Sequence, residues 1–153
     1  MADGVARLTF NNPSKHNALS REMREALPAV LRGFEEDPDV RVVVLAGAGD
    51  RAFVSGADIS EFGQQRTAPE ARREYDRLAA EAGAAWAGLT KPVIAMIQGY
   101  CIGGGLLTAL QADLRVAAEG SRFGVPAARL GLGYAYRGVE ALVALVGPAT
   151  TAE

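Results

Sequence analysis

The spacing of hydrophobic positions divides the first fifty residues into a strand, a helix and a second strand. Apolar and polar residues alternate over Val5–Phe10, which predicts a half-buried strand. An apolar stripe at helical spacing follows Ser20 and predicts an amphipathic helix to about Glu36, with Ser20 as its cap. The run Val40–Ala46, "VRVVVLA", is rich in β-branched residues and typical of a buried parallel strand.

The same alternation continues to the end of the chain. The predicted strands are Ala52–Val54, Val93–Ile97 and Leu114–Ala118, and the predicted helices are one directly after Asp58, Pro69–Leu89, Gly103–Gln111 and Val139–Val146, the last ended by Gly147-Pro148. Because strands and helices alternate throughout, the sequence predicts one α/β domain over residues 1–153. The hydrophobic spacing also suggests ββα units.

The last four residues, Thr150-Thr151-Ala152-Glu153, have the spacing of a capping box. A capping box begins a helix, and no residues follow here to form one. Either these residues are a frayed chain end, or the chain is the N-terminal portion of a longer protein.

Composition narrows the function classes. With 49% hydrophobic and 22% charged residues and a net charge of −2, the chain is globular and has no electrostatic footprint for nucleic acid. Glycines interrupt its longest apolar stretch, so no membrane span is expected. A single cysteine, Cys101, excludes an internal disulfide and favours a reducing, cytoplasmic location. One histidine and one cysteine make a transition-metal site unexpected.

Three consecutive glycines, Gly103-Gly104-Gly105, follow an apolar strand and open a helix. The first amides of a helix have no intrahelical partner and lie at the positive end of its dipole, so they can bind an anion or a developing oxyanion. Missing β-carbons let a ligand approach the backbone closely. Close packing of a strand on a helix also requires glycine, so this alternative stays open. No Lys-Ser/Thr pair follows, which excludes a P-loop.

A second turn, Ser55–Asp58, also follows a short strand and precedes a predicted helix. Two such turns could each direct one amide at the same oxygen. A carbonyl held by two backbone donors is polarised, and negative charge arriving on its oxygen is stabilised.

Three segments carry a family resemblance in order and spacing: "NNPSKHNALS", "RAFVSGADISEF" and "KPVIAMIQGYCIGGGLLTALQADLRVAAEGSRFGVPAARLGL". From about Val5 to Glu153 the chain resembles the crotonase, or enoyl-CoA hydratase/isomerase, family. The resemblance implies a spiral of ββα units and an acyl-CoA substrate, with coenzyme A as part of that substrate and no separate cofactor. It also implies a place in fatty acid metabolism and a homo-oligomer, a trimer or hexamer. The family's C-terminal helical part, which closes the acyl pocket and forms the trimers, is missing here, so the oligomer is an open expectation.

Carried over position by position, the resemblance puts the two oxyanion-hole amides on Ala57 and Gly104. It puts contacts with coenzyme A, several of them through backbone atoms, near Lys15, His16, Ala18, Ser55, Asp58 and Ile59. Gly103 and Arg137 are further candidate substrate contacts.

The chain departs from the family pattern at two positions. Members that resemble hydratases carry a glutamate three residues after the middle glycine and another after the proline of an FG-x-P motif; here these positions hold Leu107 and Ala127. Hydration needs a group that deprotonates water and one that protonates the α-carbon, and neither aliphatic side chain does this. Tyr134, Tyr136 and Arg137 stand where many relatives have a Pro-Gly-rich loop, and could donate to the substrate or pack against further helices.

Two functions follow. One is an acyl-CoA lyase or isomerase that stabilises an enolate, with isomerisation, decarboxylation and thioester hydrolysis all open. The alternative is a non-catalytic acyl-CoA-binding protein or an inactive fragment.

Overall fold

A computed structural model describes residues 3–58, 60, 69–131, 133–134 and 136–152. Its strands are β1 (Val5–Phe10), β2 (Val42–Gly47), β3 (Ala52–Val54), β4 (Val93–Ile97), β5 (Tyr100–Ile102), β6 (Leu114–Ala117) and β7 (Arg122–Gly124). Its helices are α1 (Arg21–Glu36), α3 (Pro69–Gly88), α4 (Gly104–Leu110) and α5 (Tyr136–Ala152), with short 3-10 segments η1 (Pro13–Lys15) and η3 (Pro126–Leu130).

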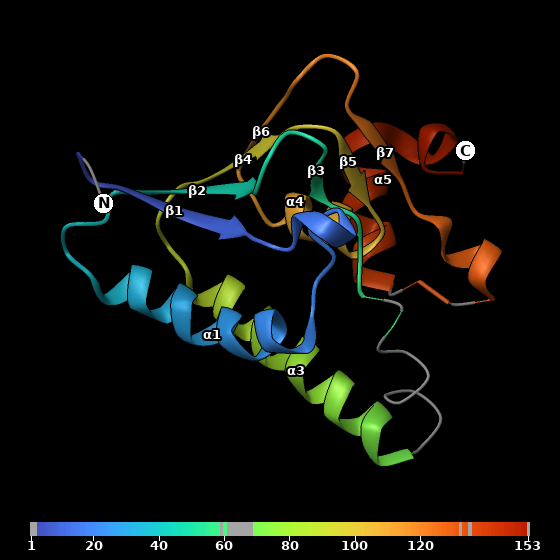
Figure 1. Cartoon of the computed structure of the whole chain (residues 1–153), viewed down its shortest axis with the longest axis horizontal. Coiled ribbons are helices and arrows are strands. Elements are labelled where there is room, and N and C mark those ends of the chain that lie inside the picture. The colour runs from blue at the N-terminus through green and yellow to red at the C-terminus, as the bar shows by residue number, and fades with distance from the viewer. Residues whose placement is uncertain (1–2, 59, 61–68, 132, 135, 153) are drawn as a thin grey trace.

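The strands form two parallel sheets, ordered β1-β2-β4-β6 and β3-β5-β7. Successive strands enter alternate sheets: β2 then β3, β4 then β5, β6 then β7. Each pair is followed along the chain by a helix, α3, α4 or α5, so every unit adds one strand to each sheet (Figure 1). The predicted α/β spiral of ββα units is confirmed.

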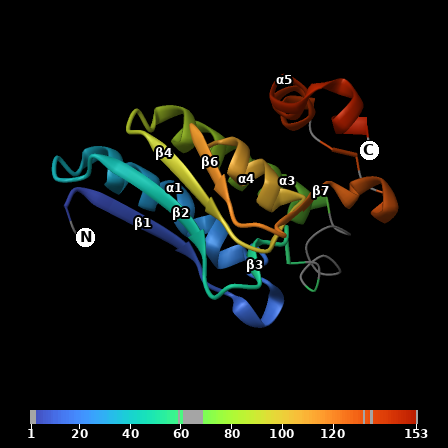
Figure 2. The ribbon, with the colours of Figure 1, turned by 90° about the horizontal axis from the view of Figure 1, so that it is seen from above.

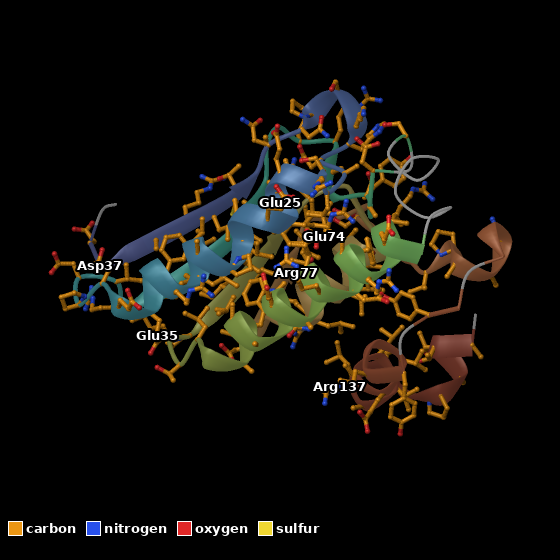
Figure 3. The ribbon with its side chains drawn as sticks, turned by 90° about the horizontal axis from the view of Figure 1, so that it is seen from below. Glu25, Glu35, Asp37, Glu74, Arg77 and Arg137 are labelled. Atoms are coloured by element: carbon orange, nitrogen blue, oxygen red, sulfur yellow. The ribbon has the colours of Figure 1, made fainter. Side chains whose placement is uncertain are left out.

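Helices α1 and α3 lie side by side across one face of the larger sheet (Figure 3). The side chains that the sheet turns toward them, including Val43, Leu45 and Ala95, are fully buried. This is where the hydrophobic core forms, because alternate residues of each strand share one face. No described element covers the opposite face (Figure 2), and there Leu114 and Val116 are each 61% exposed.

The sequence does not predict two of the strands. β5 and β7 have three residues each, too few for an alternating pattern to be recognised. The other strand boundaries agree to within about two residues, the usual uncertainty of such assignments. The strand predicted over Val40–Ala46 runs from Val42 to Gly47.

The C-terminal helix corrects one prediction and confirms another. Helix α5 begins at Tyr136 and is broken at Gly147, whose φ of 80° and ψ of 165° are non-helical, so the stop predicted at Gly147-Pro148 is confirmed. The capping-box prediction is wrong, because Thr150 lies inside a helical turn that resumes after this break. Thr151 Oγ1 donates to the Gly147 carbonyl over 2.7 Å. The helix predicted after Asp58, with Ile59, falls outside the described residues.

Candidate oxyanion-binding site

Three chain segments meet at one edge of the smaller sheet. Since β3, β5 and β7 are parallel neighbours, their carboxyl ends lie together, as ligand-binding loops of parallel sheets do. The segments that leave these ends are Ser55–Asp58, Gly103–Gly105 and Val125–Ala127. Sheet order alone therefore brings both predicted turns to one place.

The nitrogen of the Ala57 amide lies beside the glycine turn. Its neighbours bind Leu19 on the other side: Leu19 N donates to Gly56 O over 2.8 Å, and Asp58 N donates to Leu19 O over 3.1 Å. In extended backbone successive peptide groups point in opposite directions, so the Ala57 N–H points away from Leu19. A β-carbon built on Gly104 would lie 3.7 Å from Ala57 N. Among the described residues, the backbone hydrogen bonds of turns, loops and helix caps include none that is donated by the Ala57 amide or by the Gly104 amide.

The three glycines of the second turn serve different purposes. Gly103 has φ 54° and ψ −117°, a conformation that side chains disfavour. A β-carbon on Gly105 would lie 2.0 Å from the Val54 carbonyl oxygen, so this residue allows the close packing of α4 on β3. A β-carbon on Gly104 meets no atom closer than 3.7 Å, so here glycine keeps the space before Ala57 N open. The close-packing interpretation therefore holds for Gly105, and the oxyanion-binding interpretation of Gly104 stays a prediction.

Two titratable side chains lie beside the turn, and both keep their protons at neutral pH. Cys101 is fully buried on β5, and burial raises the pKa of its thiol to about 12. The Tyr134 hydroxyl lies 3.2 Å from the Gly103 carbonyl, to which it donates. Burial, with a smaller effect of Cys101, raises the pKa of Tyr134 to about 12. Neither group is ionised at neutral pH, so neither is a general base there.

Leu107 and Ala127 are both half-buried at this edge. Leu107 lies on α4 one turn after Gly104, and a β-carbon on Gly138 would lie 2.3 Å from its Cδ2 atom. Helix α5 thus contacts α4 through a residue without a side chain. Ala127 lies in η3, directly after β7.

A second cluster joins the N-terminal loop to the Ser55–Asp58 turn. Lys15 Nζ donates to Asp58 Oδ2 over 2.6 Å and to Ser60 Oγ over 2.9 Å. Asp58 is 5% exposed, and its Oδ1 accepts from the Ser60 amide at 3.0 Å and hydroxyl at 2.6 Å. The Lys15 hydrogen bond, followed by that of the Ser60 hydroxyl, lowers the pKa of Asp58. Asp58 is therefore an ionised, fully hydrogen-bonded carboxylate that holds Lys15 at the turn.

The Lys15–Asp58 pair makes the stability of the fold depend on pH. The pKa of Asp58 is lower in the folded state than in the unfolded state. Its contribution to the free energy of unfolding is therefore fully present above the unfolded-state pKa of about 4, and it is lost as the pH falls through the folded-state pKa. Asp58→Asn is therefore expected to lower the unfolding temperature at pH 7, and the gap to the wild type is expected to narrow below about pH 4. Thermal unfolding from pH 7 to pH 3, with the exposed Asp39→Asn as control, measures this. A gap that stays constant with pH would contradict it.

The other predicted substrate contacts of the N-terminal segment lie beside the same turn. Ser55 donates from its amide to His16 O and from its hydroxyl to Lys15 O, both over 3.1 Å. The His16 ring stands edge-on to Tyr100 at 5.8 Å between ring centres. Ala18 is buried. The structure thus brings the Lys15–Ala18 segment and the Ser55–Asp58 turn together.

Sequence reasoning missed Asn17, which is 1% exposed and holds these loops in place. Its Nδ2 donates to the carbonyls of Ala48 and Ala52 over 2.9 and 2.7 Å, and its Oδ1 accepts from the Asn12 amide over 3.0 Å. Its φ of 56° is a conformation that asparagine tolerates better than most residues. That tolerance is the only local signal the sequence offers.

Tyr136 and Arg137 lie on the first turn of α5 and are exposed, Tyr136 to 77%. Figure 3 labels Arg137 on this helix. Within the described part of the chain, no hydrogen bond joins either to the two turns. In the same residues there is no group of three His, Cys, Asp or Glu side chains placed to hold a metal ion. None of the helices described is both long enough and apolar enough to cross a membrane.

Comparison with known sequences gives a match along the whole chain. The family model described as enoyl-CoA hydratase/isomerase matches residues 1–153. The short-chain-enoyl-CoA hydratase of Clostridium acetobutylicum is 37% identical over 143 residues, which cover 94% of this chain and 54% of that protein. The crotonyl-CoA hydratase of Syntrophomonas wolfei is 36% identical over 144 residues, 94% of this chain and 55% of that protein. The chain spans about half the length of the curated relatives it matches.

Solved structures agree. An enoyl-CoA hydratase/isomerase family protein from Hyphomonas neptunium superimposes with a TM-score of 0.92 at 40% identity, covering 99% of this chain and 58% of that one. An enoyl-CoA hydratase/carnithine racemase from Magnetospirillum magneticum gives a TM-score of 0.91 at 35% identity, with 99% and 57% coverage.

Proposed function

Because the chain belongs to the enoyl-CoA hydratase/isomerase family, we propose that it binds an acyl-coenzyme A thioester and stabilises an enolate with the Ala57 and Gly104 amides. Lys15, His16, Ala18, Ser55, Asp58 and Ile59 are the proposed contacts of the coenzyme. Coenzyme A is part of the substrate, and no further cofactor is invoked. A cytoplasmic homo-oligomer is part of the same proposal.

The observation that carries the proposal is the juxtaposition of two backbone donors. The Ala57 N–H points away from Leu19, and a β-carbon on Gly104, which glycine lacks, would lie 3.7 Å from Ala57 N. Donors fixed in advance need no reorganisation when negative charge develops on a thioester oxygen, which is why such sites contribute strongly to rate.

We propose decarboxylation of a malonyl-type thioester as the first reaction to test, because it needs no protein base. The bond between the α-carbon and the carboxylate breaks, and its electron pair forms the enolate double bond. The carbonyl electron pair moves to the oxygen between Ala57 and Gly104, carbon dioxide leaves, and water supplies a proton to the α-carbon. The neutral Cys101 and Tyr134 are consistent with this choice. Isomerisation and hydration both need a base, which Leu107 and Ala127 do not provide.

The second candidate is a non-catalytic acyl-CoA-binding protein. The aliphatic packing of Leu107 against α5 favours it, because the position that would hold a base is filled by a side chain without chemistry. The binder retains the same two turns and the same coenzyme contacts.

Product analysis by mass spectrometry separates these functions. The purified protein is incubated with 2-enoyl, 3-enoyl, malonyl and saturated thioesters of coenzyme A. Loss of carbon dioxide from malonyl-CoA supports the first candidate, and saturable binding without any product supports the second. Rapid hydration of the 2-enoyl thioester by the unmodified protein would contradict the role given to Leu107 and Ala127.

A further inference from the structure

We infer that Tyr134 is a positioning residue whose hydroxyl fixes and polarises the Gly103–Gly104 peptide, the group that carries one of the two proposed oxyanion donors. The inference rests on the proposed function for the role of the Gly104 amide. It does not require Tyr134 to touch the substrate. Its basis is the hydrogen bond of 3.2 Å from the Tyr134 hydroxyl to the Gly103 carbonyl.

The acceptor and the donor at issue belong to the same peptide group. The carbonyl of Gly103 and the N–H of Gly104 are held in one plane with opposite directions, so whatever fixes the oxygen also aims the N–H. A hydrogen bond received by the carbonyl also shifts electron density toward its oxygen and makes the N–H a stronger donor. One hydroxyl thus affects both the direction and the strength of the Gly104 amide.

Hydrogen bonds, and no side chain of its own, restrain this peptide. Gly103 has no side chain, and a β-carbon built at this residue would meet no atom within 4 Å. Its own amide donates to Gly124 O over 2.8 Å, which fixes the preceding peptide to β7. The following peptide is held by two donors to the Gly103 oxygen: Leu107 N at 3.1 Å and the Tyr134 hydroxyl at 3.2 Å.

The tyrosine ring is itself held in place by the contact between α4 and α5. A β-carbon on Gly138 would lie 3.0 Å from Tyr134 Cε1 and 2.3 Å from Leu107 Cδ2, so the bare backbone of α5 lies against both side chains. Tyr134 is half-buried, and its hydrogen bond is stronger than an exposed one because water competes with it less. Leu107 and Tyr134 therefore pack against the same residue of α5.

Tyr134→Phe tests the inference, because it removes the hydroxyl and keeps the ring that packs against Gly138. The matched control is Tyr75→Phe on α3, which removes a hydroxyl from a ring that lies 4.9 Å from the Arg24 guanidinium. Two quantities are measured for each variant of the full chain. One is the NMR frequency of the Gly104 amide proton without ligand, and the other is kcat and KM for decarboxylation of malonyl-CoA.

In Tyr134→Phe the Gly104 amide proton is expected to move upfield and kcat to fall about tenfold, with KM unchanged, the effect of losing one hydrogen bond that matters in the transition state. Tyr75→Phe is expected to change neither quantity. Two results would overturn the positioning role and leave the proposed function intact. One is a Gly104 resonance that does not move in Tyr134→Phe. The other is an unchanged kcat in Tyr134→Phe when Gly104→Ala is inactive. If Gly104→Ala retains wild-type turnover, or malonyl-CoA is not turned over, the proposed reaction fails instead, and the Gly104 resonance still decides the role of Tyr134.

Discussion

Gly104→Ala is expected to lower kcat for thioester turnover about 10²–10³-fold, because the variant keeps its amide N–H but places a methyl group where the substrate oxygen has to approach, with an effect like that of losing one oxyanion donor. The added methyl group would lie 3.7 Å from Ala57 N, in the space where the substrate oxygen has to reach both amides. It meets no atom at a distance that would force the fold to shift. The unfolding temperature is therefore expected to stay close to that of the wild type while activity is lost.

Two further glycines provide the controls for this variant. Gly33→Ala, on the exposed face of α1 with nothing within 4 Å, is expected to leave activity unchanged. Gly105→Ala would place a β-carbon 2.0 Å from the Val54 carbonyl oxygen, and we expect it to destabilise the fold by about 1–3 kcal/mol or more. If Gly104→Ala is as active as the wild type, the hole between the two turns is not where the thioester oxygen binds.

The combined change Leu107→Glu and Ala127→Glu is expected to create hydratase activity, raising the hydration rate of crotonyl-CoA about 10²–10⁴-fold over the unmodified chain. Both positions lie at the sheet edge that carries the two turns, one on α4 and one in η3 directly after β7. Two carboxyl groups there supply what the aliphatic side chains lack: one to deprotonate water and one to protonate the α-carbon.

The double variant needs a control for shape and stability. Leu107→Gln with Ala127→Gln matches the size of the glutamates without their proton chemistry, and is expected to hydrate no faster than the wild type. Leu107 contacts α5 at Gly138, so a lower unfolding temperature is expected in both double variants. Equal hydration by the two pairs would contradict an acid–base role for these positions.

The sequence predicts the longer strands, the helices and the two glycine turns well, because these depend on local patterns, and the family resemblance implies the spiral. Alternating and β-branched runs identify the longer strands, and glycines between a strand and a helix identify the turns. Parallel pairing of β3 with β5 then brings the turns together without further information. The three-residue strands β5 and β7 were missed because they are defined by their pairing and not by their composition.

What the sequence does not predict are contacts between distant segments. The bond from Tyr134 to Gly103 spans 31 positions, and the Lys15–Asp58 ion pair spans 43. The residue type alone does not identify the partner, since a tyrosine or a lysine in a loop has many possible partners within reach. Asn17 is a similar case, because its role depends on which carbonyls the fold places around its buried amide.

The most direct test of the central claim is the infrared spectrum of butyryl-CoA, labelled with carbon-13 at the thioester carbonyl and bound to the unmodified chain. Two backbone donors on one oxygen weaken the carbonyl bond, so the labelled band is expected to move to lower frequency on binding and to return toward its aqueous position in Gly104→Ala. A bound thioester whose carbonyl band is the same as in water would contradict the claim that Ala57 and Gly104 form an oxyanion hole.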